Sequence, residues 1–87
     1  MASRFETSGH IFAPARSAKE LMRADGELFV RWAYATLLGR EADLDGLRFY
    51  LRRMSEGKTK VSILKQMSRS PEGKARGVRL PGLQGAI

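Results

Sequence analysis

The sequence predicts an all-α protein, a small bundle of three to four short helices with a flexible N-terminal arm and a C-terminal tail. Apolar residues between positions 28 and 67 recur at steps of three and four, which is the period of an amphipathic helix. Capping residues and glycines divide this pattern into segments with short connections, which suits antiparallel or steeply crossing helices. No alternating apolar run of strand length competes with it.

A first long helix is expected between Asp25 and Gly39. Asp25 is a favourable N-cap residue, and Glu27 in the first turn complements the positive end of the helix dipole. Gly39 is expected to end the helix in the left-handed conformation. Upstream, residues 17–20 have the spacing of a capping box and can begin a short helix through Met22. The apolar stripe of the long helix consists of Phe29, Val30, Ala33, Tyr34, Leu37 and Leu38, with Trp32 at its edge.

Two further helices are expected after short turns. Asp43 is predicted to cap the second helix, which ends at Gly57, and Thr59 is predicted to cap the third. The buried stripe of the second helix is Leu47, Tyr50, Leu51 and Met54, and its other faces carry mainly Arg48, Arg52 and Arg53. The buried stripe of the third helix is Val61, Ile63, Leu64 and Met67.

A fourth helix is predicted to begin at Ser70, Pro71 and Glu72. These residues supply a cap, a proline at the first helical position and an acid in the first turn. Gly73 and Gly77 are expected to weaken this helix, because glycine costs helix stability. The fourth helix should therefore be short.

The chain has 87 residues, enough for one domain. Residues 1–24 are expected to form a flexible basic arm that can hold a short helix, residues 25–77 the helical domain, and residues 78–87 a tail or a cut linker. No run of about 18 apolar residues is present, so no membrane span is expected. The N-terminus is also too polar for a secretory signal. We therefore expect the chain to be cytoplasmic, or appended to an envelope-associated protein.

The residue types needed for catalysis are scarce, and we do not expect an enzyme. The chain has no cysteine, which excludes a disulfide or a thiolate metal site, and its single histidine lies in the predicted arm. Three acids, Glu41, Asp43 and Asp45, leave a calcium loop as an alternative. Gly46 falls at the sixth position of such a loop, but Arg52 occupies the twelfth, where a bidentate acid is needed. Helix capping explains the acids better, so the sequence predicts no catalytic residue, no metal site and no cofactor.

Several of these residues together form a recognisable pattern: Phe29-Val30, Ala33-Tyr34, Leu37-Leu38-Gly39-Arg40, Asp43, Gly46-Leu47, Tyr50 and Ser70-Pro71-Glu72. This pattern resembles a widespread bacterial family, domain of unknown function family 4214, which is similar to part of the phycobilisome linker domain. The resemblance covers about residues 25–73. Ala42 stands where the family usually has proline, and Tyr50 where it often has tryptophan. Neither change threatens the fold.

The resemblance implies a compact helical module appended to larger bacterial proteins, among them surface and calcium-repeat proteins and glycosyltransferases of polysaccharide assembly. It implies no established activity, although the likeness to the linker domain suggests protein–protein contact by analogy of fold. Arg40 can bond the carbonyls that end the first helix or pair with Asp43 or Glu72, and an exposed Arg40 can bind an anionic partner. The structural motif is Gly39, Arg40, Asp43, Gly46, Ser70, Pro71 and Glu72. The aromatic residues at helical spacing are expected in the core rather than on a sugar or a base: Trp32, Tyr34 and Tyr50.

The net charge of +7 is concentrated in residues 58–87, which hold seven basic residues and one acid. The candidate binding surface is therefore Lys58, Lys60, Lys65, Arg69, Lys74, Arg76 and Arg79. Such a segment can track phosphates, but it lacks the aromatic residues that stack on single-stranded bases. The sequence thus favours a non-catalytic interaction module with a protein partner or self-association. A small basic nucleic-acid-binding domain is the alternative, and a calcium-binding accessory domain is favoured least.

Overall fold

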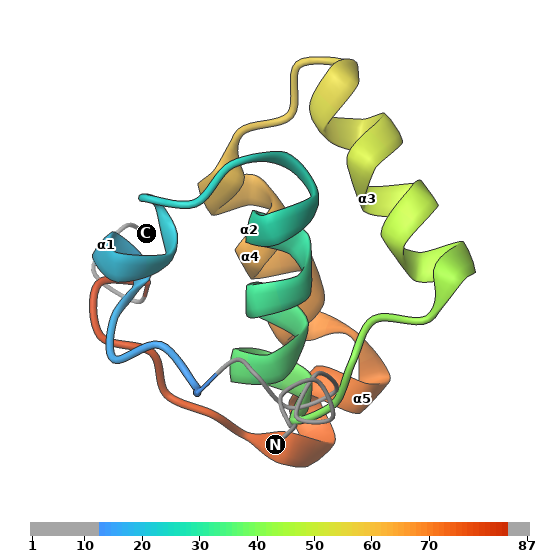
Figure 1. Cartoon of the computed structure of the whole chain (residues 1–87). Coiled ribbons are helices and arrows are strands. Elements are labelled where there is room, and N and C mark those ends of the chain that lie inside the picture. The colour runs from blue at the N-terminus through green and yellow to red at the C-terminus, as the bar shows by residue number, and fades with distance from the viewer. Residues whose placement is uncertain (1–12, 84–87) are drawn as a thin grey trace, which may run out of the picture.

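The computed structural model describes residues 13–83 and has no strand among them. Its elements are α1 (Ala18–Leu21), α2 (Gly26–Ala33), the π-helical turn η2 (Tyr34–Leu38), α3 (Leu44–Ser55), α4 (Lys60–Arg69) and α5 (Pro71–Arg76). Helix α2 and η2 form one central helix (Figure 1), α4 and α5 pack against η2, and α3 packs along α2 on the side away from α1. The predicted all-α fold is confirmed. Within residues 13–83, no helix is long and apolar enough to cross a membrane.

The core lies where the central helix meets α4. Its largest fully buried side chains come mostly from these two elements: Leu21, Phe29, Val30, Leu37, Ile63, Leu64, Met67 and Leu80. Full burial of a side chain of this size contributes roughly 1.5–3 kcal/mol. Helix α3 packs on this core through its predicted stripe, with Tyr50 buried and Leu47, Leu51 and Met54 partly buried. The apolar stripes predicted for the first and third helices are therefore confirmed, and α3 keeps much of its surface exposed.

Four of the five predicted N-caps form as expected. Ser17, Asp43, Thr59 and Ser70 each accept a hydrogen bond from the backbone N–H three residues further on, at 3.1 Å in every case. The prediction for Asp25 was wrong in part. It precedes α2 with an extended backbone, but its side chain makes no capping bond. Its Oδ1 instead accepts from Lys60 Nζ at 2.6 Å, because the folded chain brings the start of α4 beside it.

The central helix ends as predicted at Gly39, which has φ of 67°. The sequence did not indicate that its last turn, η2, would be π-helical. A π turn inserts an extra residue per turn and occurs mostly as a single turn. Here it contains three further core residues besides Tyr34, namely Thr36, Leu37 and Leu38.

The packed unit extends beyond residues 25–77 at both ends. The Trp32 indole N–H donates to the carbonyl of Ala13 at 2.8 Å, and Ala15 N–H donates to Thr36 Oγ1 at 2.9 Å. After α5, the chain runs back to α1 (Figure 1), where Pro81 accepts from the N–H of Ala18 at 2.8 Å. Buried residues outside the expected domain are Ala15, Ala18, Leu21, Ala24, Leu80 and Leu83. The described parts of the predicted arm and tail thus belong to the fold, while residues 1–12 and 84–87 lie outside the described residues.

Candidate functional site

Arg40 lies at the centre of the motif. It follows Gly39 in the turn between η2 and α3, and its Nε and Nη2 donate to the two carboxylate oxygens of Glu72 at 2.6 and 2.9 Å. Its Nη1 donates to the carbonyl of Glu41 at 2.9 Å and to Asp43 Oδ1 at 3.3 Å. Both predicted partners, Asp43 and Glu72, are therefore present. We call Arg40, Asp43 and Glu72 the Arg40 clasp, because it joins the start of α3 to α5.

The charges of the clasp alter one another's protonation. The hydrogen bond from Arg40 lowers the pKa of Glu72. The pKa of Asp43 is lowered first by the backbone N–H of Gly46 and then by Arg40. The same pairing raises the pKa of Arg40. The three groups are charged at neutral pH, and all are solvent-exposed, so their contribution to stability is that of a bidentate surface pair rather than a buried one.

Tyr34 packs against the Arg40 side chain of the clasp. The Arg40 guanidinium lies over its ring at 5.1 Å from the centroid, and the ring meets Tyr50 edge-on at 6.1 Å. Gly46 completes this contact, because a Cβ there would overlap the Tyr34 hydroxyl. The motif glycine at position 46 is thus needed for close approach, a role that the sequence pattern did not indicate.

The fourth helix is short, as predicted, since α5 has six residues and ends at Gly77. Gly73 has a further role that the sequence did not indicate, because it is buried. A Cβ on Gly73 would overlap the backbone carbonyl of Met67 and lie 2.8 Å from that of Ser68. Glycine is therefore required where α5 crosses the end of α4. Ser70 links the two helices, as the last cap of α4 and the first cap of α5.

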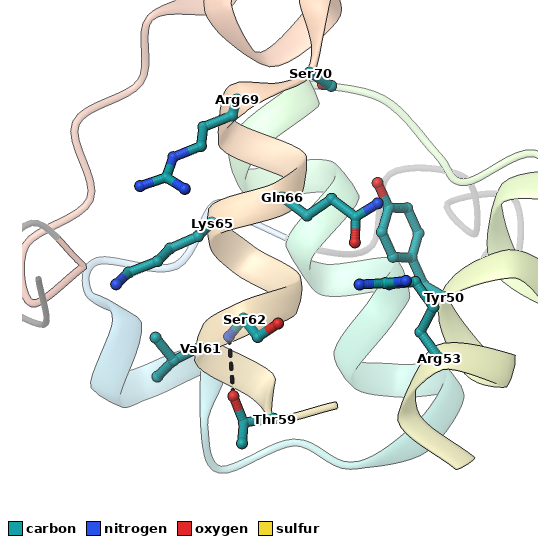
Figure 2. A pocket seen from close by; sticks show the side chains of 9 residues that line it. All are labelled: Tyr50, Arg53, Thr59, Val61, Ser62, Lys65, Gln66, Arg69 and Ser70. Atoms are coloured by element: carbon teal, nitrogen blue, oxygen red, sulfur yellow. Dashed lines mark hydrogen bonds between the residues drawn. The ribbon is translucent and has the colours of Figure 1, made fainter. Parts of the chain in front are cut away.

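A groove of about 740 Å³ lies between α3 and α4. Figure 2 shows Tyr50 and Arg53 entering it from α3 toward Gln66, with Lys65 and Arg69 along the other side of α4. Its lining holds no carboxylate and no histidine: Tyr50, Arg53, Thr59, Val61, Ser62, Lys65, Gln66, Arg69 and Ser70. The groove is therefore lined mainly by cationic and uncharged polar side chains, with Val61 as the one aliphatic residue of the lining.

The groove also contains unsatisfied polar atoms. Arg53 Nε and Gln66 Oε1 are buried, and neither has a hydrogen-bond partner among the described residues. The Arg53 guanidinium lies over the Phe49 ring at 5.7 Å from the centroid. Burial raises the pKa of the Tyr50 hydroxyl. Arg53 was not among the predicted binding residues, although its position one turn after Tyr50 was a usable signal.

A family model described as Domain of unknown function (DUF4214) matches residues 12–76. The chain belongs to this family. The match begins ahead of residue 25, in agreement with the packing of residues 13–24 on the bundle. Neither curated proteins nor solved structures gave a match. The likeness to phycobilisome linkers and the bacterial origin stay predictions.

In this DUF4214 domain, the seven basic residues predicted as one binding surface do not lie together on one surface. Lys60 is part of the fold, because its Nζ donates to Asp25 and, at 2.9 Å, to the carbonyl of Met22. The Arg76 side chain covers Gly39 closely enough to meet any Cβ there. Only Lys65 and Arg69 line the groove. The other members are exposed elsewhere: Lys58, Lys74 and Arg79.

Of the three acids that suggested a calcium loop, Asp43 has both carboxylate oxygens bonded within the fold. Asp43 uses Oδ1 for Arg40 and Oδ2 for the N–H of Gly46. Across residues 13–83, no three acid, histidine or cysteine side chains gather in a way that could hold a metal ion. In the DUF4214 domain, the turn from Gly39 to Asp43 is best described as the joint between η2 and α3.

Proposed function

We propose that this DUF4214 domain is a non-catalytic interaction module that contacts another protein within a larger bacterial assembly, of the envelope, polysaccharide or surface-protein kind. The observation that carries the proposal is that some polar residues of the domain bond within the fold, whereas others line a surface without an ion-pair partner. The polar motif residues bond to other parts of the fold, either in the Arg40 clasp or as helix caps. The α3–α4 groove instead keeps cations that no described acid neutralises. A surface that the fold does not use is available to a partner.

The chemistry of the groove favours binding over catalysis. General acid–base catalysis needs a group that titrates near the working pH, and the lining offers only Tyr, Lys and Arg for this. Ser70 does not provide a free nucleophile, because its hydroxyl donates to the Met67 carbonyl and accepts from the Gly73 N–H. A nucleophile would also need an adjacent base.

Nucleic acid is the second candidate, supported by the exposed cations that have no ion-pair partner among the described residues. Two observations make it weaker. The basic residues do not form one continuous track, since Lys60 is paired with Asp25. The only aromatic ring in the groove, Tyr50, is 8% exposed, so it offers little stacking surface. Calcium binding is supported less again, because Asp43 already serves Arg40 and a helix cap.

Affinity capture and sedimentation test the proposal. The full 87-residue chain is tagged and expressed in its host, and captured proteins are identified by mass spectrometry. Capture by the wild type is compared with capture by a Lys65→Glu/Arg69→Glu variant. We expect a defined partner, or a concentration-dependent dimer in sedimentation velocity. A strictly monomeric chain that captures no protein would refute the proposal, and salt-sensitive binding to duplex DNA or RNA alone would favour the second candidate.

A further inference from the structure

The solvent-facing stripe of α4 has a fixed direction. Ile63, Leu64 and Met67 are buried on the core side, so rotation of α4 about its axis is prevented. The opposite stripe follows the spacing of one helical face and holds Ser62, Lys65, Gln66 and Arg69. Lys65 and Arg69 are four residues apart, so their Cβ atoms are roughly 5–6 Å apart. Two like charges at this spacing disfavour the helix unless something neutralises them.

Arg53 supplies a third positive charge from the opposite helix. It lies on α3, one turn after Tyr50, and lines the same groove as Lys65 and Arg69 (Figure 2). No described carboxylate pairs with it. Its Nε and the nearby Gln66 Oε1 are both without a hydrogen-bond partner in residues 13–83. The groove thus presents three cations and no acid, and two polar atoms of its lining are buried without a partner among the described residues.

We infer that the α3–α4 groove binds an acidic segment of a partner protein, whose carboxylates pair with Lys65, Arg69 and Arg53. This inference rests on the proposed function and names the chemistry of the partner. Carboxylates match the groove because guanidinium groups bind them in a bidentate manner and ammonium groups bind them as point charges. The partly buried Val61 also lines the groove and can contact an apolar side chain of the segment.

Charge complementarity favours this occupant over a second copy. The chain carries a net charge of +7, so two copies repel one another at long range. Single-stranded nucleic acid is favoured less, because Tyr50, the ring that lines the groove, is buried, and the exposed Phe49 lies outside the lining with the Arg53 guanidinium over its ring. An acidic protein segment uses the cations without needing that platform.

Fluorescence anisotropy with defined probes tests the inference. The full chain is titrated against a fluorescein-labelled peptide of four Glu-Glu-Leu repeats, against the matching Gln-Gln-Leu peptide, and against a single-stranded oligonucleotide and a duplex of comparable charge. We expect the Glu peptide to bind and the Gln peptide to bind at least about tenfold more weakly. Amide shifts in NMR spectra should change at residues of α3 and α4 that border the groove.

Paired charge reversals provide the matched control. Lys65→Glu/Arg69→Glu should weaken Glu-peptide binding by about tenfold or more, whereas Lys74→Glu/Arg79→Glu should change it by less than about threefold. Both variants alter net charge equally, so general electrostatic attraction affects them alike. Circular dichroism checks that both fold, and Lys65→Gln/Arg69→Gln is used if the reversal does not.

The outcomes separate this inference from the proposed function. Three results would overturn the groove assignment. They are equal weakening of Glu-peptide binding by the two charge reversals, equal affinity for the Glu and Gln peptides, and a higher affinity for either nucleic acid than for the Glu peptide. If a captured partner is also retained by Lys65→Glu/Arg69→Glu, the domain remains an interaction module that uses another face. If neither partner nor peptide binds, both proposals fail.

Discussion

Replacing Gly73 with alanine should destabilise the domain, although helix propensity alone predicts the opposite. Alanine is favoured over glycine in a helix by about 1 kcal/mol. At this position, however, the new Cβ would overlap the carbonyl of Met67 and lie 2.8 Å from that of Ser68. Backbone carbonyls at the end of α4 cannot rotate away as a side chain can. Overpacking of this kind costs typically 1–3 kcal/mol, and a value near the upper end leaves a net loss of about 2 kcal/mol.

Ala75→Gly provides the control, because Ala75 is an exposed residue of the same short helix. It should cost about 1 kcal/mol through propensity alone. For a chain of this size, each kcal/mol corresponds to about 4–8 °C in Tm. Gly73→Ala should therefore lower Tm by roughly 8–16 °C, and Ala75→Gly by roughly half as much. Thermal and urea unfolding followed by circular dichroism measure both. A Tm that rises in Gly73→Ala would refute the argument from close packing.

Three further predictions concern the clasp and its support. Gly46→Ala should destabilise by about 1 kcal/mol, because a steric cost of 1–3 kcal/mol exceeds the gain in helix propensity. In a Tyr34→Phe background, where the overlapping hydroxyl is absent, a double-mutant cycle should show a smaller cost, since the closest contact is removed and those with Tyr34 Cζ and Asp43 Oδ1 remain. Glu72→Gln should lower Tm at neutral pH and low salt by a few degrees, whereas Glu41→Gln, which makes the same charge change in the η2–α3 turn without a side-chain ion pair, should not. The lowered pKa of Glu72 means that its contribution is complete above the pKa of an unfolded glutamate, about 4.3, and is lost as the pH falls through the lower folded value. Tm measured against pH should therefore fall more steeply below about pH 4 in the wild type than in Glu72→Gln, and parallel curves would contradict the assignment.

The sequence predicted most of the helices because their signals are local. A cap such as Asp43 or Thr59 acts on a backbone N–H only three residues away, and both formed as expected. The buried stripe of α4 needs nothing beyond the helical period. Gly39 likewise ends its helix through its own backbone conformation. Such features require no knowledge of which elements meet.

The sequence failed where distant segments meet. Lys60 seemed to be a free surface cation, but Asp25 is brought to it from 35 positions away. Leu80 belonged to a predicted tail, yet it is buried because the chain returns to α1. Arg53 was placed on an outer face because the angle between α3 and α4 was unknown. The groove could not be predicted for the same reason, since it exists only in the space between the two helices.

The clasp and the groove are separate sites, but both involve α3 and the junction between α4 and α5. Arg40 ties the turn before α3 to Glu72 of α5. Helix α5 in turn begins at Ser70, which ends α4 and also lines the groove. The clasp therefore ties the start of α3 to the helix that follows α4, while Tyr50 and the partly buried Leu47, Leu51 and Met54 pack the rest of α3 on the core. A motif that has a structural explanation throughout thus also helps to position α3, one of the two helices that border the groove.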